Sequence, residues 1–466
     1  MRKGLSILGV LFCGLLAGGS IWAAAQNPLI PNPLMSGVSP KERKRKHAPE
    51  KNSPQPTFAI PVTQLGFSEP AAFYLGSRFS QVSLHFLDED HLLFTFRVPG
   101  LISRERQPGP QPSGDTGTER RIHAVVLALP SGQITAEAIW TLHDYRPYLW
   151  MLNNQRFLLR DQNQLRMGDA ALHLEPFLRF PGTVLHVELD PDQQLLITST
   201  VEPKTAGVAS TGNSPVPDTA AVSKTPVSDD DSKNTQTQNM LRILRMDSLK
   251  VLMAAPVTGI PHLPADGEGY YEVPRGKGMS WVVSYSNFHG GVIPLYPVDS
   301  TCMPALDVLT RSVIMASSCA TNDWHYLTAI RSDLSRDFTH GPGHSDSKDK
   351  QRLWEISTSP YDVWPVLARS TSGTRFARAL LHVEHPVNAN NPLNPEEIHS
   401  QTVSVYDMAT GKSPLSLQVS PILDGGGNFA LSPSGNRFAV LNSGQIQVFE
   451  LPPAPPLPSL AAPVSK

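Results

Sequence analysis

Short apolar runs separated by small polar clusters make up most of this chain. Asp, Asn, Pro, Ser and Gly, the residues that tight turns favour, recur in these clusters, so two runs around one cluster predict a β-hairpin. The pattern is clearest in FALSPSGNRFAVL, Phe429 to Leu441. Earlier segments repeat it: Val82 to Val98, Tyr148 to Asp161, Val184 to Thr200, Ala305 to Cys319, and Val363 to Val383. A weaker copy lies in Tyr270 to Asn287.

Most of these hairpins are followed by a second pair of strand candidates. Val125 to Trp140, Ile243 to Met253 and Val403 to Leu417 are complete pairs, and Ala329 to Leu334 is a fragment. Runs such as LLFTF and RFAVL are almost continuously apolar, as a strand must be when neighbouring blades cover both of its faces. Four strands a unit, repeated about seven times, predict a β-propeller. The predicted fold is therefore an all-β propeller. The simplest count is seven blades of four antiparallel strands.

Polar insertions interrupt the repeat near residues 104–120, 204–238, 340–350 and 386–399. They hold few large apolar residues and cannot bury enough surface to offset the entropy of ordering, so we predict flexible loops. The second insertion is long enough for a domain linker, but its two flanks look like halves of one unit. We therefore predict one propeller domain over residues 58–452, and not two domains.

The last unit is one strand short, because only Ile446 to Leu451 follows its hairpin before a Pro-rich tail at residues 453–466. Phe58 to Phe67 is a strand candidate with no partner nearby in the sequence. We predict that it pairs with Ile446 to Leu451, which completes the last blade and removes an open sheet edge.

From about residue 58 to residue 452, the chain resembles the seven-bladed propellers of the WD-repeat and YVTN-like group. It is most similar to uncharacterised exported propeller proteins of soil bacteria such as acidobacteria. FALSPSGNRFAVL, VSVYDMATGK and PSGQITAE carry the resemblance, because SPSG before an apolar run and a D-x-x-T-G-K turn are typical of bacterial blades. No blade ends in Trp-Asp, so the adaptor roles of eukaryotic WD-repeat proteins are not transferred. The resemblance implies a fold and not a reaction.

The N-terminus has the parts of a secretory signal peptide, predicted over residues 1–25. Arg2 and Lys3 precede an apolar stretch that ends at three alanines. An uncleaved anchor is the alternative, since the stretch has about the minimum length of a membrane span. A lipid anchor at Cys13 is not expected, because Phe12 stands where a small residue is required. We predict a secreted or periplasmic protein with no membrane span after cleavage.

Residues 26–57 predict a Pro-rich, basic linker. Its segment KERKRKHAPEK, Lys41 to Lys51, is either solvated or in contact with an anionic envelope polymer or membrane surface. Over the whole chain the formal net charge is −2, which indicates no nucleic-acid partner. The 44 prolines and 17% charged residues favour turn-rich β structure. We expect a monomer whose partner is a protein or an envelope polymer.

Cys302 and Cys319 are the cysteines that remain after export, and they form a possible disulfide. In a hairpin that turns at Thr310-Arg311, opposed residue numbers sum to 621, and this pair satisfies the sum. Opposed Cα atoms lie within disulfide range. Two buried free thiols are the alternative, because Pro304 disturbs the ladder beside Cys302.

Histidines and acidic residues are the candidates for chemistry. His340 and His344 lie in a polar loop that also contains Asp337, Asp346 and Asp349. These side chains could bind a divalent metal, but the simpler interpretation is a solvated loop. His85 and His186 occupy like positions in two hairpins, and this repetition favours a structural role. Asp88, Asp190 and Asp307 are expected to form turn or strand-end hydrogen bonds.

Catalytic motifs are missing from the sequence: it holds no G-x-S-x-G elbow, no C-x-x-C-H and no phosphate-binding loop. We assign no catalytic, cofactor-binding or metal-binding residue and expect no cofactor. The function predicted is that of an exported, non-catalytic binding or scaffold propeller. The alternative is a metal-dependent hydrolase of lactonase type, in which carboxylates and amides from several blades would converge on an axial metal.

Overall fold

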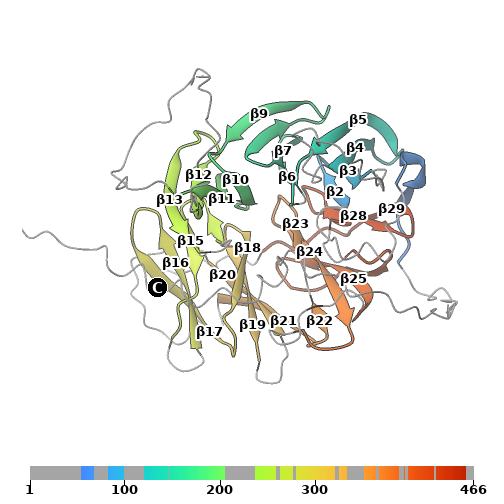
Figure 1. Ribbon diagram of the computed structural model, residues 1–466. Coiled ribbons are helices and arrows are strands. Elements are labelled where there is room, and N and C mark those ends of the chain that lie inside the picture. Colours follow the sequence, from blue (N-terminus) through green and yellow to red (C-terminus); the bar gives the residue numbers. More distant parts are fainter. Residues whose placement is uncertain are drawn as a thin grey trace, which may run out of the picture.

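The computed structural model places the described chain in a ring of seven sheets around a central axis (Figure 1). It describes residues 54–67, 82–98, 120–144, 146–204, 237–258, 263–276, 280–320, 325–332, 351–363, 367–387, 393, 397–423 and 427–457. The predicted signal peptide, most of the basic linker and most of each predicted insertion lie outside these residues. Among the described residues, no helical segment reaches the length and hydropathy that a membrane span requires.

Each blade is an antiparallel sheet, and in blades 1 to 6 the strands follow one another in the chain from the inside of the ring outward. Blade 1 contains β2 (Val82–Phe86), β3 (His91–Arg97), β4 (Arg120–Ala128) and β5 (Gln133–Leu142). Blade 2 contains β6 (Leu149–Leu152), β7 (Arg156–Asp161), β8 (Gln164–Gly168) and β9 (Leu174–Arg179). Blade 3 contains β10 (Thr183–Leu189), β11 (Leu195–Pro203), β12 (Thr237–Arg245) and β13 (Val251–Val257).

Blades 4 to 6 repeat the arrangement. Blade 4 contains β14 (Ala265–Asp266), β15 (Gly269–Glu272), β16 (Ser280–Asn287) and β17 (Val292–Asp299). Blade 5 contains β18 (Ala305–Thr310), β19 (Val313–Cys319), β20 (His325–Arg331) and β21 (Arg352–Thr358). In blade 6 the inner strand is interrupted, and β22 (Asp362–Val363) and β23 (Leu367–Arg369) both pair with β24 (Arg375–Val383), which β25 (Ile398–Asp407) and β26 (Leu415–Val419) follow.

The N-terminal strand closes the ring, as predicted. Blade 7 contains β27 (Phe429–Leu431), β28 (Arg437–Asn442) and β29 (Gln445–Glu450), and β1 (Phe58–Pro61) is its outer strand. β1 pairs with β29 from Phe58 opposite Val448 to Pro61 opposite Gln445. A short 3-10 helix, η2 (Thr63–Leu65), takes the place of the second half of the predicted strand. The all-β fold with seven four-stranded blades is therefore confirmed.

The hydrophobic core is divided among the gaps between blades, and a separate apolar cluster fills each of the seven gaps. The second strand of a blade is buried on both faces: in β3 every residue from Leu92 to Phe96 is buried. This explains why the runs LLFTF and RFAVL do not alternate with polar residues. Since each blade covers its neighbours, no blade has an independent core.

Two sequence predictions about individual hairpins were wrong. The weak copy at Tyr270 to Asn287 spans β15 and β16, the second and third strands of blade 4, because the inner strand β14 has only 2 residues. The hairpin of blade 5 turns at Arg311-Ser312, one residue later than predicted, because a bulge between Val308 and Thr310 adds one residue to β18. Ala305 therefore lies opposite Ser317, and not opposite Ala316.

Candidate ligand-binding site

The turns between the first and second strands of all blades lie on one face of the ring, which we call the inner-turn face. The inner strands all run in the same direction along the axis of the ring. Their first-to-second-strand turns therefore lie on the same face. The connection between the second and third strands leaves from the opposite face in blades 1, 3 and 6, where three of the predicted insertions fall. The turns between first and second strands are short, whereas the fourth predicted insertion falls in the connection between β20 and β21 of blade 5, which leaves from the inner-turn face.

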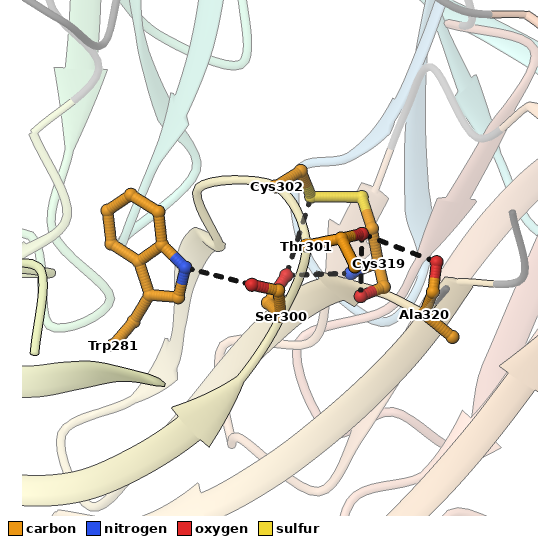
Figure 2. The surroundings of a disulfide bond; sticks show 6 residues. All are labelled: Trp281, Ser300, Thr301, Cys302, Cys319 and Ala320. Atoms are coloured by element: carbon orange, nitrogen blue, oxygen red, sulfur yellow. Dashed lines mark hydrogen bonds between the residues drawn. A yellow bond between two sulfur atoms is a disulfide. The ribbon is translucent and has the colours of Figure 1, made fainter. Parts of the chain in front are cut away.

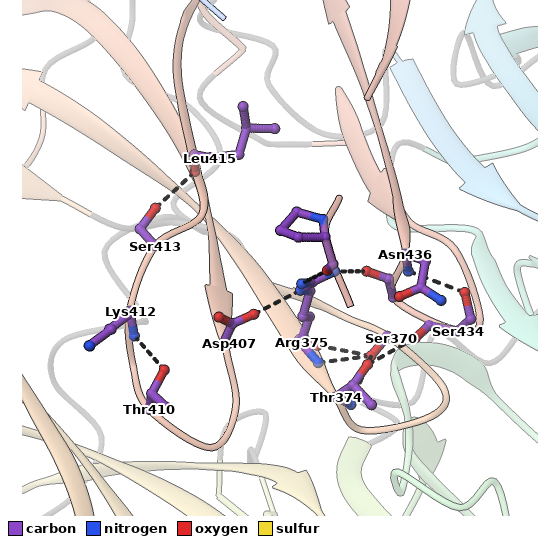
Figure 3. Close-up of polar contacts among 12 residues, drawn as sticks. Ser370, Thr374, Arg375, Asp407, Thr410, Lys412, Ser413, Leu415, Ser434 and Asn436 are labelled. Atoms are coloured by element: carbon purple, nitrogen blue, oxygen red, sulfur yellow. Dashed lines mark hydrogen bonds and ion pairs between the residues drawn. The ribbon is translucent and has the colours of Figure 1, made fainter. Parts of the chain in front are cut away.

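Three of these turns share one structure, which the SPSG motif of blade 7 exemplifies. Ser432 N–H donates to Arg437 O, Gly435 N–H donates to Ser432 O, and Arg437 N–H donates to Ser432 Oγ at 3.2 Å. In blade 6 Ser370 occupies the position of Ser432 with the same three bonds, and Figure 3 shows the contact between Ser370 and Arg375. In blade 3 Asp190 takes this position, and its Oδ1 accepts the N–H of Leu195 at 2.6 Å.

Contacts between successive turns run around the whole ring. Gln155 Nε2 of blade 2 donates to the Asp88 carboxylate of blade 1, and Asn153 N–H of blade 2 donates to Gln193 Oε1 of blade 3 at 2.6 Å. Gly267 of blade 4 lies against Gln194 of blade 3, where an added Cβ would come within 2.3 Å of the Gln194 amide.

The contacts of the remaining blades complete the circle. Glu268 of blade 4 pairs with Arg311 of blade 5 at 3.2 Å, and Gly373 of blade 6 lies against Thr310 of blade 5. Other contacts link blades 6 and 7 and blades 7 and 1: Ser372 N–H to Pro433 O at 2.8 Å, Thr374 Oγ1 to Ser434 O at 2.9 Å, and Ser434 N–H to Glu89 Oε1 at 2.6 Å. The turns therefore form one connected rim, which holds the side chains in it in fixed positions.

A cavity of about 380 Å³ opens at the axis within this rim. Its walls come from five blades and combine amide, carboxyl and hydroxyl groups with apolar side chains. The polar part is Asp88, Glu89, Asn153, Asn154, Gln155, Gln193 and Thr371, and the apolar part is Phe86, Leu87, Met151, Leu152 and Pro433. Apolar side chains together with a few fixed polar groups are the usual lining of a small-ligand site.

The Asp88 carboxylate is held in its charged form. Burial alone would raise the pKa of Asp88, but hydrogen bonds from His91 and from Asp90 N–H outweigh it and lower the pKa below its ordinary value. His91 Nδ1 lies 2.9 Å from Asp88 Oδ2. Asp88 is therefore a fixed negative charge in the wall of the cavity.

Gln193 adopts a backbone conformation that glycine usually takes. Its φ is +57°, and Gly373 and Gly435 stand at the same turn position in blades 6 and 7 with φ of +67° and +77°. A non-glycine residue in this region costs about 1 kcal/mol. The side chain offsets this cost, since it accepts a hydrogen bond from Asn153 N–H and reaches the carbonyl of Met151 at 3.4 Å.

Arg369 crosses the central channel. It ends the inner strand of blade 6, and its guanidinium donates to Val308 O of blade 5 at 2.5 Å and to Leu189 O of blade 3 at 2.9 Å. Burial lowers the pKa of Arg369, and the carboxylates of Glu188, Asp190, Asp307 and Asp192 oppose that shift. The guanidinium thus links three inner strands and carries a positive charge into a channel lined by acidic side chains.

Of the candidates that the sequence predicted, Asp88 lines the cavity, and His85, His186, Asp190 and Asp307 lie elsewhere. His85 and His186 lie on the inner strands of blades 1 and 3, where His85 Nε2 contacts Ser83 Oγ at 2.5 Å and His186 Nε2 lies 3.5 Å from Glu188. Burial lowers the pKa of His85 to about 4. Asp88 and Asp190 form turn hydrogen bonds, whereas Asp307 lies inside β18. The loop with His340 and His344 lies outside the described residues.

Blade 6 contains a hydrogen-bonded chain of three side chains. His382 Nδ1 lies 2.6 Å from Asp362 Oδ1, and His382 Nε2 lies 2.9 Å from Thr402 Oγ1. The three residues come from adjacent strands, β22, β24 and β25, so the chain joins these strands side by side. Over the residues whose placement is described, no group of three His, Cys, Asp or Glu side chains could hold one metal ion.

Cys302 and Cys319 are joined by a disulfide in the structure, with Cα atoms 5.5 Å apart (Figure 2). Cys302 lies in the segment between blades 4 and 5, outside β18, and Cys319 ends β19. Thr301 N–H donates to Cys319 O at 3.0 Å, and Cys319 N–H donates to Ser300 Oγ at 2.9 Å. The bridge therefore fastens the connection between two blades to the second strand of blade 5.

The fold and the cavity define the class of this protein, a seven-bladed β-propeller with a concave polar site at one end of its axis. No family model matches the chain, and no curated protein sequence matches it. Among solved structures, a chain of a mitotic checkpoint complex is 10% identical, with 90% of this chain and 99% of that chain covered and a TM-score of 0.42.

Two further structures are similar at the same level. An acylaminoacyl peptidase of Pyrococcus horikoshii is 8% identical with a TM-score of 0.41, and the match covers 80% of this chain and 51% of that chain, about half of the peptidase. The Cps50 (Swd1) β-propeller domain of Myceliophteria thermophila is 11% identical, with 80% of this chain and 99% of that domain covered and a TM-score of 0.35. The propeller class rests on the sheet topology of the chain itself.

Proposed function

We propose that this chain is an exported, non-catalytic binding propeller whose ligand enters the axial cavity on the inner-turn face. One observation carries the proposal: rigid turns from five blades converge on one cavity, and a complete circle of contacts between blades fixes them. A site that is formed before the ligand arrives saves the entropy of ordering its own side chains. The partner is a protein or an envelope polymer that inserts a polar group.

The side chains of the rim suit recognition better than proton transfer. Asn153, Asn154, Gln155 and Gln193 offer amides, which donate and accept hydrogen bonds but do not change charge at ordinary pH. Asp88 is fixed as a carboxylate by His91, so it would orient a donor of the ligand. Export is supported by the sequence of residues 1–25 and by the disulfide, which suits an oxidising compartment.

A substitution that blocks the mouth of the axial cavity tests this function. Thr371 is exposed in the cavity wall, so Thr371→Trp should fill the mouth, while Gln133→Trp places the same side chain on the exposed outer strand β5. Wild type would be screened by biolayer interferometry against immobilised peptidoglycan fragments, envelope polysaccharides and a heptapeptide library. We expect each specific ligand to bind Thr371→Trp at least 10-fold more weakly and Gln133→Trp unchanged. Equal binding to all three proteins would refute the axial site.

A further inference from the structure

The Pro-rich segment after the last strand is seated on the ring. Residues 451–457 read LPPAPPL, and they follow β29 onto the inner-turn face. Leu451 N–H donates to Asn436 O at 2.8 Å, and the Leu451 side chain packs against the apolar cluster between blades 6 and 7. Leu457 packs against the cluster between blades 5 and 6. The segment therefore crosses blade 6 with one leucine in the gap on each side.

The gap that receives Leu457 contains a stack of aromatic rings. Phe376 lies between Trp354 and Tyr406, with ring centroids 5.5 Å and 5.1 Å apart and interplanar angles of 14° and 12°. Trp354 Nε1–H donates to Met408 O at 2.8 Å, which fixes the indole. These rings belong to the apolar cluster against which Leu457 packs, so the gap offers an aromatic surface to the end of the Pro-rich segment.

A buried arginine lies under the segment between the two leucines. The Arg375 side chain is 0% exposed, its Nε donates to Asp407 at 2.9 Å and its Nη1 donates to Gly435 O at 2.8 Å (Figure 3). Its Nη2 donates to the carbonyl of Pro452. A proline has no N–H and its carbonyl has no internal partner in an extended helix, so a fixed donor recognises such a segment by its carbonyl groups.

The spacing of the two leucines is large enough for the distance to be crossed. Six residue steps of an extended polyproline helix span about 19 Å. Stacked sheets lie about 10 Å apart, and blades diverge away from the axis, so this length reaches from one gap to the next. The segment thus presents one pattern, which consists of two leucines, four prolines and the carbonyl group of Pro452. Blade 6 and the gap on each side of it accept this pattern.

We propose that the two gaps beside blade 6, with Arg375 between them, form a recognition site for a segment of the pattern Leu-Pro-Pro-x-Pro-Pro-Leu. Residues 451–457 of the same chain occupy this site. A partner with a Pro-rich segment of the same spacing binds only after the chain's own segment has left. The site is separate from the axial cavity and does not depend on it.

A peptide binding assay on the full chain tests the proposal. The probe is a fluorescent peptide of residues 450–458, followed by anisotropy. Wild type should bind it weakly, because the tethered segment competes at high effective concentration. Leu457→Asp should release the tethered segment and bind the peptide at least 10-fold more tightly. Gln133→Ala, on the exposed outer strand β5 and outside the segment, should behave as wild type.

Controls separate recognition from a folding defect. Leu457→Ser serves as a second release variant, and the far-ultraviolet spectrum of each variant shows whether the ring is intact. A scrambled peptide, and the peptide with its own terminal leucine replaced by Asp, should bind at least 10-fold more weakly than the original. If folded Leu457→Asp or Leu457→Ser binds no more tightly than wild type, or binds the scrambled peptide equally, the proposal is overturned. Neither result bears on ligand binding at the axial cavity.

Discussion

Asp190 makes the stability of blade 3 depend on pH. It is 3% exposed, its Oδ1 accepts the N–H of Leu195, and its Oδ2 has no hydrogen-bond partner among the described residues. Burial raises the pKa of Asp190 from 3.8 to about 6, against the hydrogen bond from Leu195 and the charge of Arg369. The folded protein therefore holds a proton that the unfolded chain releases more readily.

The sign and size of the effect follow from that difference in pKa. A carboxyl group whose pKa is higher in the folded state contributes stability below its unfolded pKa, and this contribution is lost as the pH rises to the folded pKa. The shift from 3.8 to about 6 corresponds to about 3 kcal/mol of unfolding free energy, lost between about pH 4 and pH 6 and absent at pH 7.

Asp190→Ser tests this reasoning, because Ser370 and Ser432 fill the same turn position in blades 6 and 7. The hydroxyl can accept the Leu195 N–H without adding a charge. Urea unfolding from pH 4 to pH 8 should show that the variant gains about 3 kcal/mol relative to wild type over this range. Asp247→Ser, at an exposed turn of the same blade, should follow wild type. Parallel pH profiles of Asp190→Ser and wild type would refute the assignment.

Three further predictions concern how the ring is held together. Ile60→Ala in the closing strand, where Ile60 is 6% exposed, should cost about 3 kcal/mol in urea unfolding, and exposed Ile134→Ala almost nothing; equal effects would contradict the closing role of β1. Cys302→Ser should cost about 3 kcal/mol, since the bridge spans 17 residues, and identical unfolding of oxidised and reduced wild type would show that the bridge contributes no stability. Arg160→Met should cost about 4 kcal/mol of unfolding free energy, because it removes the guanidinium whose Nη2 lies 2.5 Å from Asp144 Oδ1. The double variant Arg160→Met with Asp144→Leu should recover part of this loss. Strictly additive costs of the two substitutions would exclude the coupling.

Much of the fold could be predicted because the information is local. Each of the six clear hairpins forms the first two strands of a blade, since turn residues such as Asp88 and Ser432 lie between runs that are buried on both faces. The closing strand was predictable for a different reason: the last unit lacked a strand and Phe58 to Phe67 had no partner. Blade 4 was predicted from the weak copy at Tyr270 to Asn287, but this copy is its second and third strands, because the inner strand β14 is too short to show a pattern.

The candidate site could not be predicted in the same way. Asn153, Gln193 and Thr371 are far apart in the sequence, and only the curvature of the ring brings their turns around one cavity. Arg369 precedes an ordinary turn in the sequence, and its contacts with Val308 and Leu189 depend on the positions of two other blades. Its role therefore follows from the geometry of the ring and not from any spacing along the chain.

A comparison of equivalent turns nevertheless contains a signal for the axial site. Where blades 6 and 7 have serine and glycine, blade 3 has Asp190 and Gln193, although the backbone of the turn is the same. Both replacements are unfavourable for the turn itself, since one buries a carboxyl group and the other places a side chain at positive φ. The gains lie outside the turn: the charge of Asp190 acts on Arg369 in the channel, and the amide of Gln193 binds blade 2 in the cavity wall. Departures from a repeat that cost local stability thus indicate where the ring forms its site.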